Sequence, residues 1–152
     1  MTQKTILYVE DSDVDVFFMQ RVFEKLDALD CLRVVHNGEN AILYLAGVGG
    51  FGNRQAFPLP ALVLLDLNLP GKQGFDVLEW IRQQPQFQWL PVVIFSASAL
   101  EADRKRAKEL GANDYIVKPN DMTRVSDLLS SVFSRFLNIA AHVEDGPRSV
   151  VL

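Results

Sequence analysis

Five residues with side chains suited to phosphate chemistry each follow an apolar segment of this sequence. Glu10 and Asp11 come after the first segment, Asp66 after the third, Ser96 after the fourth and Lys118 after the fifth. If the fold brings three such carboxylates within ~4–6 Å, they repel one another by about 1–4 kcal/mol per pair, so they need a cation. Magnesium prefers oxygen ligands and usually takes one or two carboxylates plus a phosphate. The pattern therefore favours magnesium-dependent phosphoryl chemistry.

The elements that must position these residues are strands with helical patterns between them. The apolar segments cover residues 5–9, 31–35, 62–65, 91–95 and 114–117. Uniformly apolar strands such as 62–65 and 92–95 are typical of a parallel sheet covered by helices on both faces. The expected fold class is α/β, doubly wound. In such a sheet the ligand site lies outside the carboxyl ends of the strands, where the five polar residues stand.

Three of the intervening helices have distinct patterns. The last predicted helix, residues 125–137, has apolar residues at i, i+3, i+4, i+7, i+8, i+11 and i+12 and should cover the sheet. The first should bury Val14, Phe17, Phe18 and Val22. Residues 100–110 are mostly polar, so we expect that helix to be lightly anchored and largely exposed.

Two segments lack periodicity. Residues 47–60 are rich in glycine, proline and asparagine and are expected to form a long surface loop. After Asn138 the amphipathic pattern stops, which predicts a domain over residues 4–138. Residues 139–152 should then form a tail that is disordered alone or ordered by a partner.

Composition excludes several classes of protein. The chain has 152 residues, with 15 basic and 19 acidic side chains and a net charge of −4, which argues against a general nucleic-acid binder. Its single cysteine, Cys31, excludes an intrachain disulfide. No apolar run approaches the ~18 residues needed to span a bilayer, and no secretory signal opens the chain. We expect a cytoplasmic protein that binds neither DNA nor membrane.

Four runs of sequence carry a family resemblance. They are ILYVED (6–11), LVLLDLNLPGKQGFDVL (62–78), VVIFSAS (92–98) and GANDYIVKP (111–119). In this order and spacing they resemble the receiver domain of two-component response regulators, over about residues 4–138. The resemblance implies a flavodoxin-like fold, with a five-stranded parallel sheet of order 2-1-3-4-5 and five helices.

The same resemblance implies a role for each acidic residue. Asp66 would accept the phosphoryl group. Asp11, helped by Glu10, would bind Mg²⁺ together with Asp66 and the backbone carbonyl of Asn68. Glu10 stands where aspartate is more usual in the family, and it keeps the required carboxylate.

The remaining matched positions would sense the phosphoryl group. Lys118 would pair with its oxygens, and the bond between Lys118 and Pro119 would be cis. Ser96 would supply the hydroxyl that moves toward the acylphosphate, and Tyr115 would be the aromatic switch coupled to it. The output face would then consist of residues 100–110, 114–117 and 125–137.

The implied partners are proteins. The chain resembles stand-alone regulators that take phosphate from a sensor histidine kinase or a phosphotransfer protein and act by docking on a downstream target, and it would not be a conventional enzyme. Only about fourteen residues follow Asn138, so we expect no output domain. The LDLNLP run and the long loop also resemble regulators paired with bacterial phytochromes. In that subgroup a homodimer through the output face is plausible, with Phe133 or Phe136 adding apolar area.

Two other functions compete with this interpretation. Asp11, Asp13 and Asp15 form D-x-D-x-D, which resembles the start of haloacid-dehalogenase-type phosphatases, where the first aspartate is the nucleophile. That alternative leaves Asp66 without a role. The other is a scaffold with a receiver fold that no longer switches. A G-x-G-x-x-G run at residues 47–52 lacks the strand before it and the helix after it that a dinucleotide site requires.

Overall fold

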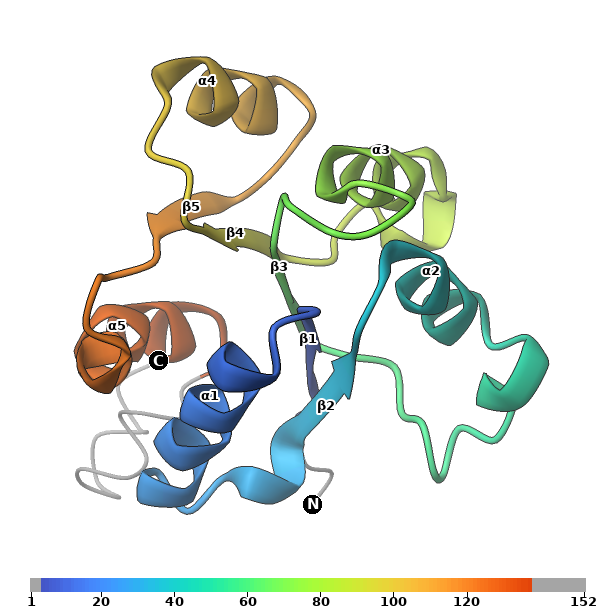
Figure 1. The fold of residues 1–152 in the computed structure, drawn as a ribbon. Helices are drawn as coiled ribbons and strands as arrows, with labels where there is room; N and C mark the ends of the chain where they lie inside the picture. The colour runs from blue at the N-terminus through green and yellow to red at the C-terminus, as the bar shows by residue number, and fades with distance from the viewer. Residues whose placement is uncertain (1–3, 138–152) are drawn as a thin grey trace.

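A computed structural model describes residues 4–137 and shows a single five-stranded parallel sheet in the order β2-β1-β3-β4-β5 (Figure 1). The strands are β1 (Ile6–Val9), β2 (Leu32–Val35), β3 (Leu62–Leu65), β4 (Val92–Ser96) and β5 (Asp114–Val117). The α-helices are α1 (Asp13–Lys25), α2 (Gly38–Ala46), α3 (Gly74–Gln83), α4 (Glu101–Glu109) and α5 (Val125–Phe136). Short 3-10 turns are η1 (Leu29–Cys31), η2 (Gly49–Phe51), η3 (Pro85–Phe87) and η4 (Met122–Arg124). The predicted fold class and strand order are confirmed.

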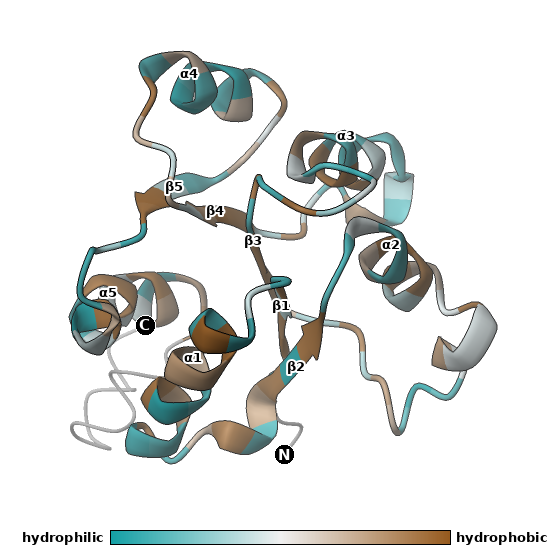
Figure 2. Cartoon of the chain, viewed as in Figure 1, coloured by the Kyte–Doolittle hydropathy of each residue, from teal (hydrophilic) through white to brown (hydrophobic). Residues whose placement is uncertain are grey.

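Helices cover both faces of the sheet, with α1 and α5 on one side and α2, α3 and α4 on the other (Figure 1). Alternate residues of β1 enter the two cores: Ile6 and Tyr8 pack toward α1 and α5, and Leu7 and Val9 toward α2 and α3. The central strands β1, β3 and β4 are buried throughout, as their apolar sequences predict, and they form the hydrophobic centre seen in Figure 2. This double cover leaves the strand ends as the place for polar groups.

Helix α1 buries only part of the face that its sequence suggested: Val22 is buried as predicted and Phe18 is half-buried, but the other two residues are not. Val14 is 62% exposed and Phe17 50% exposed, whereas Val16, Met19, Val22 and Phe23 are buried. The helix is apolar at two overlapping sets of positions, and the sheet selects the set that includes Met19. Because residues four apart share a helix face, this choice also places the side chain at position 15 above Met19, toward the strand ends.

Helix α4 is anchored as lightly as its sequence indicated, since Ala107 is its only buried residue among those described. Helix α5 buries most of the predicted stripe, including Val125, Leu129, Val132 and Phe133, whereas Leu128 is exposed and Phe136 is only partly buried. The polar surface of α4 is visible in Figure 2.

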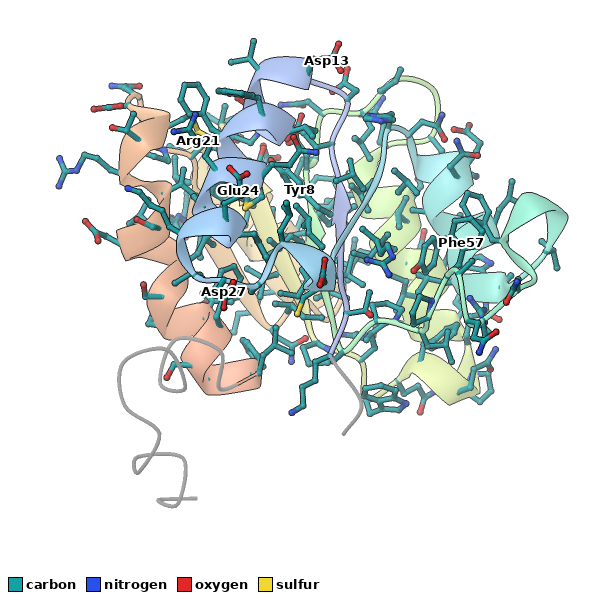
Figure 3. The ribbon with its side chains drawn as sticks, turned by 90° about the horizontal axis from the view of Figure 1, so that it is seen from below. Tyr8, Asp13, Arg21, Glu24, Asp27 and Phe57 are labelled. Carbon is teal, nitrogen blue, oxygen red and sulfur yellow. The ribbon has the colours of Figure 1, made fainter. Side chains whose placement is uncertain are left out.

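The long segment between α2 and β3 is a packed loop, which its composition did not reveal. Rings of Tyr44, Phe51 and Phe57 meet with centroids 5.1–5.8 Å apart. The guanidinium of Arg54 donates hydrogen bonds to the carbonyl oxygens of Tyr44, Leu45 and Phe57. Figure 3 shows Phe57 next to α2, where its ring packs on Tyr44. The loop is thus held by its own aromatic cluster rather than by periodic structure.

The strand boundaries moved by at most one residue from those expected. Residue Cys31 belongs to η1 rather than to β2, and Ser96 is the last residue of β4. The predicted tail, residues 139–152, lies outside the described part of the chain. Within residues 4–137 the structure has no helix that is both long and apolar enough to cross a membrane.

The start of α3 packs directly on the loop that carries Asp66, and glycine makes this possible. A Cβ atom at Gly74 would lie 2.3 Å from the carbonyl oxygen of Asp66 and 2.7 Å from the Cα of Leu67. Gly74→Ala should therefore lower the free energy of unfolding by about 1–3 kcal/mol, as overpacking does. Urea denaturation measures this.

Gly50→Ala is the matched control, because a Cβ at Gly50 would meet no atom within 4 Å. Equal stability of the two variants would contradict the close approach of α3 to the Asp66 loop.

Candidate functional site

The register of β1 and β3 places their terminal carboxylates side by side. Val9 pairs with Leu65, so Glu10 and Asp66 leave the sheet at the same level. The backbone N–H of Glu10 donates to the carbonyl oxygen of Val35 and that of Asp66 to the carbonyl oxygen of Val9. With Asp11, these residues each offer a carboxylate oxygen, all within 4.8 Å of one another. The predicted convergence of the three carboxylates is confirmed.

The two inner carboxylates are removed from water. Glu10 is 1% exposed and Asp66 is 4% exposed, while Asp11 lies at the surface. The pKa of Glu10 is raised to about 7, mainly by burial, which together with the charge of Asp66 outweighs the lowering effect of the hydrogen bond from Lys118. Glu10 is thus poised between its charged and neutral forms near neutral pH.

Two neighbours in the sequence also donate hydrogen bonds to the Glu10 carboxylate. The hydroxyl of Tyr8 donates to Oε1 of Glu10 at 3.2 Å, and the N–H of Ser12 donates to Oε2 at 3.1 Å. Burial and the neighbouring carboxylates raise the pKa of Tyr8 well above its usual range, so its hydroxyl stays a neutral donor. Sequence reasoning missed Tyr8, which looks like an ordinary core residue of β1.

Lys118 is the basic centre of the cluster. Its ammonium lies 2.6 Å from Oε1 of Glu10, 2.7 Å from Oδ2 of Asp15 and 3.2 Å from Oδ2 of Asp66. These contacts use all three N–H bonds of the ammonium. Although burial lowers the pKa of Lys118, hydrogen bonds to Asp15 and Glu10 and the charge of Asp66 raise it above its ordinary value. The lysine stays charged throughout the physiological range.

Asp15 was assigned no role by the receiver interpretation of the sequence. It was noticed only as the last residue of the D-x-D-x-D run. The spacing from Asp11 to Asp15 is i to i+4 near the start of a helix, which puts both on the side of the strand ends once the buried face of α1 is known. That face could not be chosen from the sequence.

Ser96 and Tyr115 lie on neighbouring strands, but their side chains are not hydrogen-bonded to each other. Ser96 is fully buried at the end of β4, and its hydroxyl accepts from the N–H of Ser98 at 3.3 Å. The hydroxyl of Tyr115 donates to the carbonyl oxygen of Ser98 at 2.9 Å, and the Arg104 guanidinium lies 5.0 Å from its ring centroid. The loop that begins at Ser96 therefore holds Tyr115 in a half-buried position.

Neither serine of this loop caps α4. The N-cap of α4 is Leu100, and the hydroxyl of Ser98 donates to Oδ2 of Asp103 at 2.6 Å. Ser96 is thereby left without a helix-capping role.

Two expectations concerned the backbone of the site: the position of Asn68 near Asp66 and a cis bond between Lys118 and Pro119. The N–H of Asn68 donates to Oδ1 of Asp66 at 3.2 Å, so this loop does fold back on the acceptor carboxylate. The expected cis bond between Lys118 and Pro119 is wrong, because residues 4–137 contain no cis peptide. The trans form is the one that X–Pro bonds favour by about 0.5–1 kcal/mol. The Lys118 ammonium reaches all three carboxylates with this bond trans.

The donor set fits a divalent metal ion. Glu10, Asp11 and Asp66 offer only oxygen atoms, the ligands that hard cations prefer. With Asp15 the site has four carboxylates, three of them in contact with the one ammonium, so the ionised site carries excess negative charge that Lys118 alone does not balance. A cation held between a buried and an exposed carboxylate would keep water ligands on its open side.

An acidic cluster whose oxygens fit a divalent cation lies at the carboxyl edge of a doubly wound sheet, with a lysine in contact with a buried aspartate. This is the arrangement that the sequence resemblance predicts for a receiver domain. The chain belongs to the response regulator receiver domain family, whose pattern matches residues 6–130. It is accordingly a receiver domain of two-component signalling, as the sequence motifs indicated.

Relatives match most of the chain. Response regulator Rcp1 of Synechocystis sp. is 34% identical over 134 residues, which cover 88% of this chain and 89% of Rcp1. The structure of its Mn²⁺-bound form superposes with a TM-score of 0.77. The phosphorylated cyanobacterial phytochrome response regulator RcpA is 31% identical, with a TM-score of 0.82, over 90% of this chain and 95% of RcpA. A response regulator in red light signalling of R. palustris is 33% identical, with a TM-score of 0.82, over 90% of this chain and 96% of that one.

The raised pKa of Glu10 predicts pH-dependent cation binding. Below about pH 7 the carboxyl holds a proton that a metal ion must displace, so Mg²⁺ affinity should be about tenfold weaker at pH 6 than at pH 8. Calorimetric titration at both pH values measures this.

Glu10→Gln removes the titrating group and should give a weaker affinity that is the same at pH 6 and pH 8. An unchanged affinity of the unmodified protein between these pH values would contradict the assignment of Glu10 as a ligand.

Proposed function

We propose that this receiver domain accepts a phosphoryl group on Asp66 in a Mg²⁺-dependent reaction, with Lys118 neutralising the phosphoryl oxygens. The observation that carries the proposal is the ion pair between Lys118 and Asp66: the ammonium lies 3.2 Å from the buried Asp66 carboxylate, within the acidic cluster. Phosphoryl transfer depends mainly on positioning and on stabilising charge, and this arrangement supplies both.

The transfer itself is a displacement at phosphorus. An oxygen of the Asp66 carboxylate attacks the phosphorus atom of the donor, the bond from phosphorus to the donor atom breaks, and an acylphosphate forms on Asp66. Glu10, Asp11 and Asp66, with the backbone carbonyl of Asn68, would hold Mg²⁺, which when bound supplies charge to the phosphoryl oxygens. Asp66 is well suited to attack because it is buried and kept in place by Asn68 and Lys118.

The donor would be a sensor histidine kinase or a phosphotransfer protein. Membership of the receiver family supports a histidine kinase as partner. The red-light and phytochrome regulators among the relatives support a phytochrome as the kinase of this chain. The 90–96% coverage of both chains in these matches favours that subgroup.

The output would pass through Ser96 and Tyr115 to the surface formed by α4, β5 and α5. A phosphoryl group adds about −1.5 to −2 charge at Asp66 and attracts a nearby hydroxyl such as that of Ser96. Motion of Ser96 would disturb the loop whose Ser98 carbonyl accepts from Tyr115. Because α4 is anchored mainly by Ala107, this face can shift at low cost and be read by a downstream protein.

A homodimer through the same face remains a proposal, with one change. Phe133 is fully buried against Phe23, with ring centroids 5.2 Å apart, so it cannot contribute apolar area to a partner. Phe136, which is only partly buried, and the exposed Leu128 are the apolar residues of α5 that remain available.

The acceptor assignment has a direct test. Incubation with Mg²⁺ and a small acyl phosphate should add one phosphoryl group, which peptide mass spectrometry should locate on Asp66. Asp66→Asn should abolish labelling, because the amide is not a nucleophile toward phosphorus. Labelling on Asp11 instead would support the phosphatase alternative, and absence of any labelling would support a scaffold that no longer switches.

The coupling of Ser96 to Tyr115 predicts a second result. With fluorotyrosine incorporated, the ¹⁹F signal of Tyr115 should shift on phosphorylation, whereas that of Tyr44, buried beside the long loop, should not. Ser96→Ala should still be labelled on Asp66 but should lose the Tyr115 shift. An equal shift in Ser96→Ala would exclude Ser96 as the link.

A further inference from the structure

We infer that Asp15 is a positioning residue that keeps the Lys118 ammonium in place for the phosphoryl group, an inference that rests on the proposed role of Asp66. Asp15 lies in the first turn of α1, which contributes none of the three clustered metal-type ligands. Its Oδ2 is nevertheless 2.7 Å from the Lys118 ammonium, closer than the 3.2 Å of Asp66. Asp15 thus contacts the lysine almost as closely as Glu10 does at 2.6 Å, although it has no other assigned role.

The three partners of Lys118 differ in what else they must bind. Glu10 and Asp66 belong to the cluster that fits a cation, and Asp15 does not. A cation that takes oxygens of Glu10 and Asp66 also repels the ammonium, since like charges at short range disfavour each other. Of the three carboxylates in contact with Lys118, Asp15 is then the one that binds the ammonium without also binding the cation.

The local structure of α1 releases Asp15 for this task. Ser12 caps the helix, and its hydroxyl accepts from the N–H of Asp15 at 3.2 Å, the first half of a capping box. In a full box the Asp15 carboxylate would accept from the N–H of Ser12. Here that N–H donates to Glu10 instead, at 3.1 Å, and the carboxylate of Asp15 turns to Lys118. The cap fixes the backbone of Asp15, and Glu10 leaves its side chain available.

Contacts with β4 also help to position Lys118. The Lys118 ammonium lies 5.8 Å from the ring centroid of Phe95, and its backbone N–H donates to the carbonyl oxygen of Ser96 at 2.8 Å. The base of the side chain is therefore fixed by β4, and Asp15 fixes its far end. Without Asp15, the ammonium would be free to follow either remaining carboxylate or to leave when a cation arrives.

The first test observes Lys118 without relying on phosphorylation. The ¹⁵N resonance of the Lys118 ammonium, assigned by its loss in Lys118→Gln, should be visible in the unmodified protein with and without Mg²⁺. In Asp15→Asn it should shift or broaden, most strongly with Mg²⁺ present, and Asp15→Glu should restore it in part. The matched control is Asp13→Asn, which removes an equal charge from the same turn at the exposed position shown in Figure 3.

The second test measures Asp66 labelling by a small acyl phosphate with saturating Mg²⁺. Asp15→Asn should slow labelling about tenfold, the loss expected for one hydrogen bond between charged groups, while Asp13→Asn should change it less than about twofold. In a Lys118→Gln background, Asp15→Asn should cause no further loss, because Asp15 acts through the lysine.

The outcomes separate this inference from the proposed function. If Asp15→Asn behaves as Asp13→Asn in both tests, or slows labelling equally with and without Lys118, the positioning role is wrong although Asp66 remains the acceptor. If the unmodified protein is never labelled, the proposed function fails and the role in phosphoryl transfer fails with it. Urea denaturation of each variant shows that the fold is kept.

Discussion

The structure depends on one electrostatic constraint: several carboxylates are held together at the end of a buried sheet with a single ammonium among them. Glu10 and Asp66 are almost fully buried, and a buried charge is unfavourable unless it is paired and hydrogen-bonded. Lys118 meets this need with three contacts, Tyr8 donates to the same Oε1 of Glu10 as the lysine, and the N–H of Ser12 donates to Oε2. The cluster is stable in this form, and it still retains excess negative charge.

The parallel sheet is what makes such crowding feasible. Five parallel strands deliver their carboxyl ends to one edge, so residues 56 positions apart, Glu10 and Asp66, emerge side by side from paired strands. The apolar strands below are buried on both faces and leave little room for relaxation. Gly74 shows how tight this edge is, since even a methyl group there would overlap the carbonyl of Asp66. The carboxylates are therefore brought together by the register of the strands and not by the loops alone.

Sequence reasoning recovered the residues whose chemistry is unusual for their place and missed those whose chemistry is ordinary. Asp66 and Lys118 stood out because charges rarely end apolar strands without a reason. Tyr8 and Asp15 did not stand out, because a core tyrosine and an aspartate in a first helical turn are common. The failure for α1 has a physical cause: Val14 and Phe17 are as apolar as Met19 and Phe23, and only the tertiary packing decides which set is buried. Residues 47–60 form the surface loop that was predicted, but its internal order was not predictable, since Arg54 orders it through backbone carbonyls that no side-chain pattern reports.

The same charge balance explains how this site can change state without losing its structure. A divalent cation would add +2, and phosphorylation would replace the single negative charge of the Asp66 carboxylate with about −1.5 to −2 on the acylphosphate. The cation would therefore more than offset the added negative charge and reduce the excess negative charge of the site. What must change is which oxygens each positive group contacts. The three carboxylates in contact with Lys118 would then have unequal roles: Glu10 and Asp66 would exchange the ammonium for a cation, and Asp15 would keep its contact with the lysine. On the proposed function, this exchange of contacts would leave the fold in place and let a small shift of Ser96 and its loop follow phosphorylation.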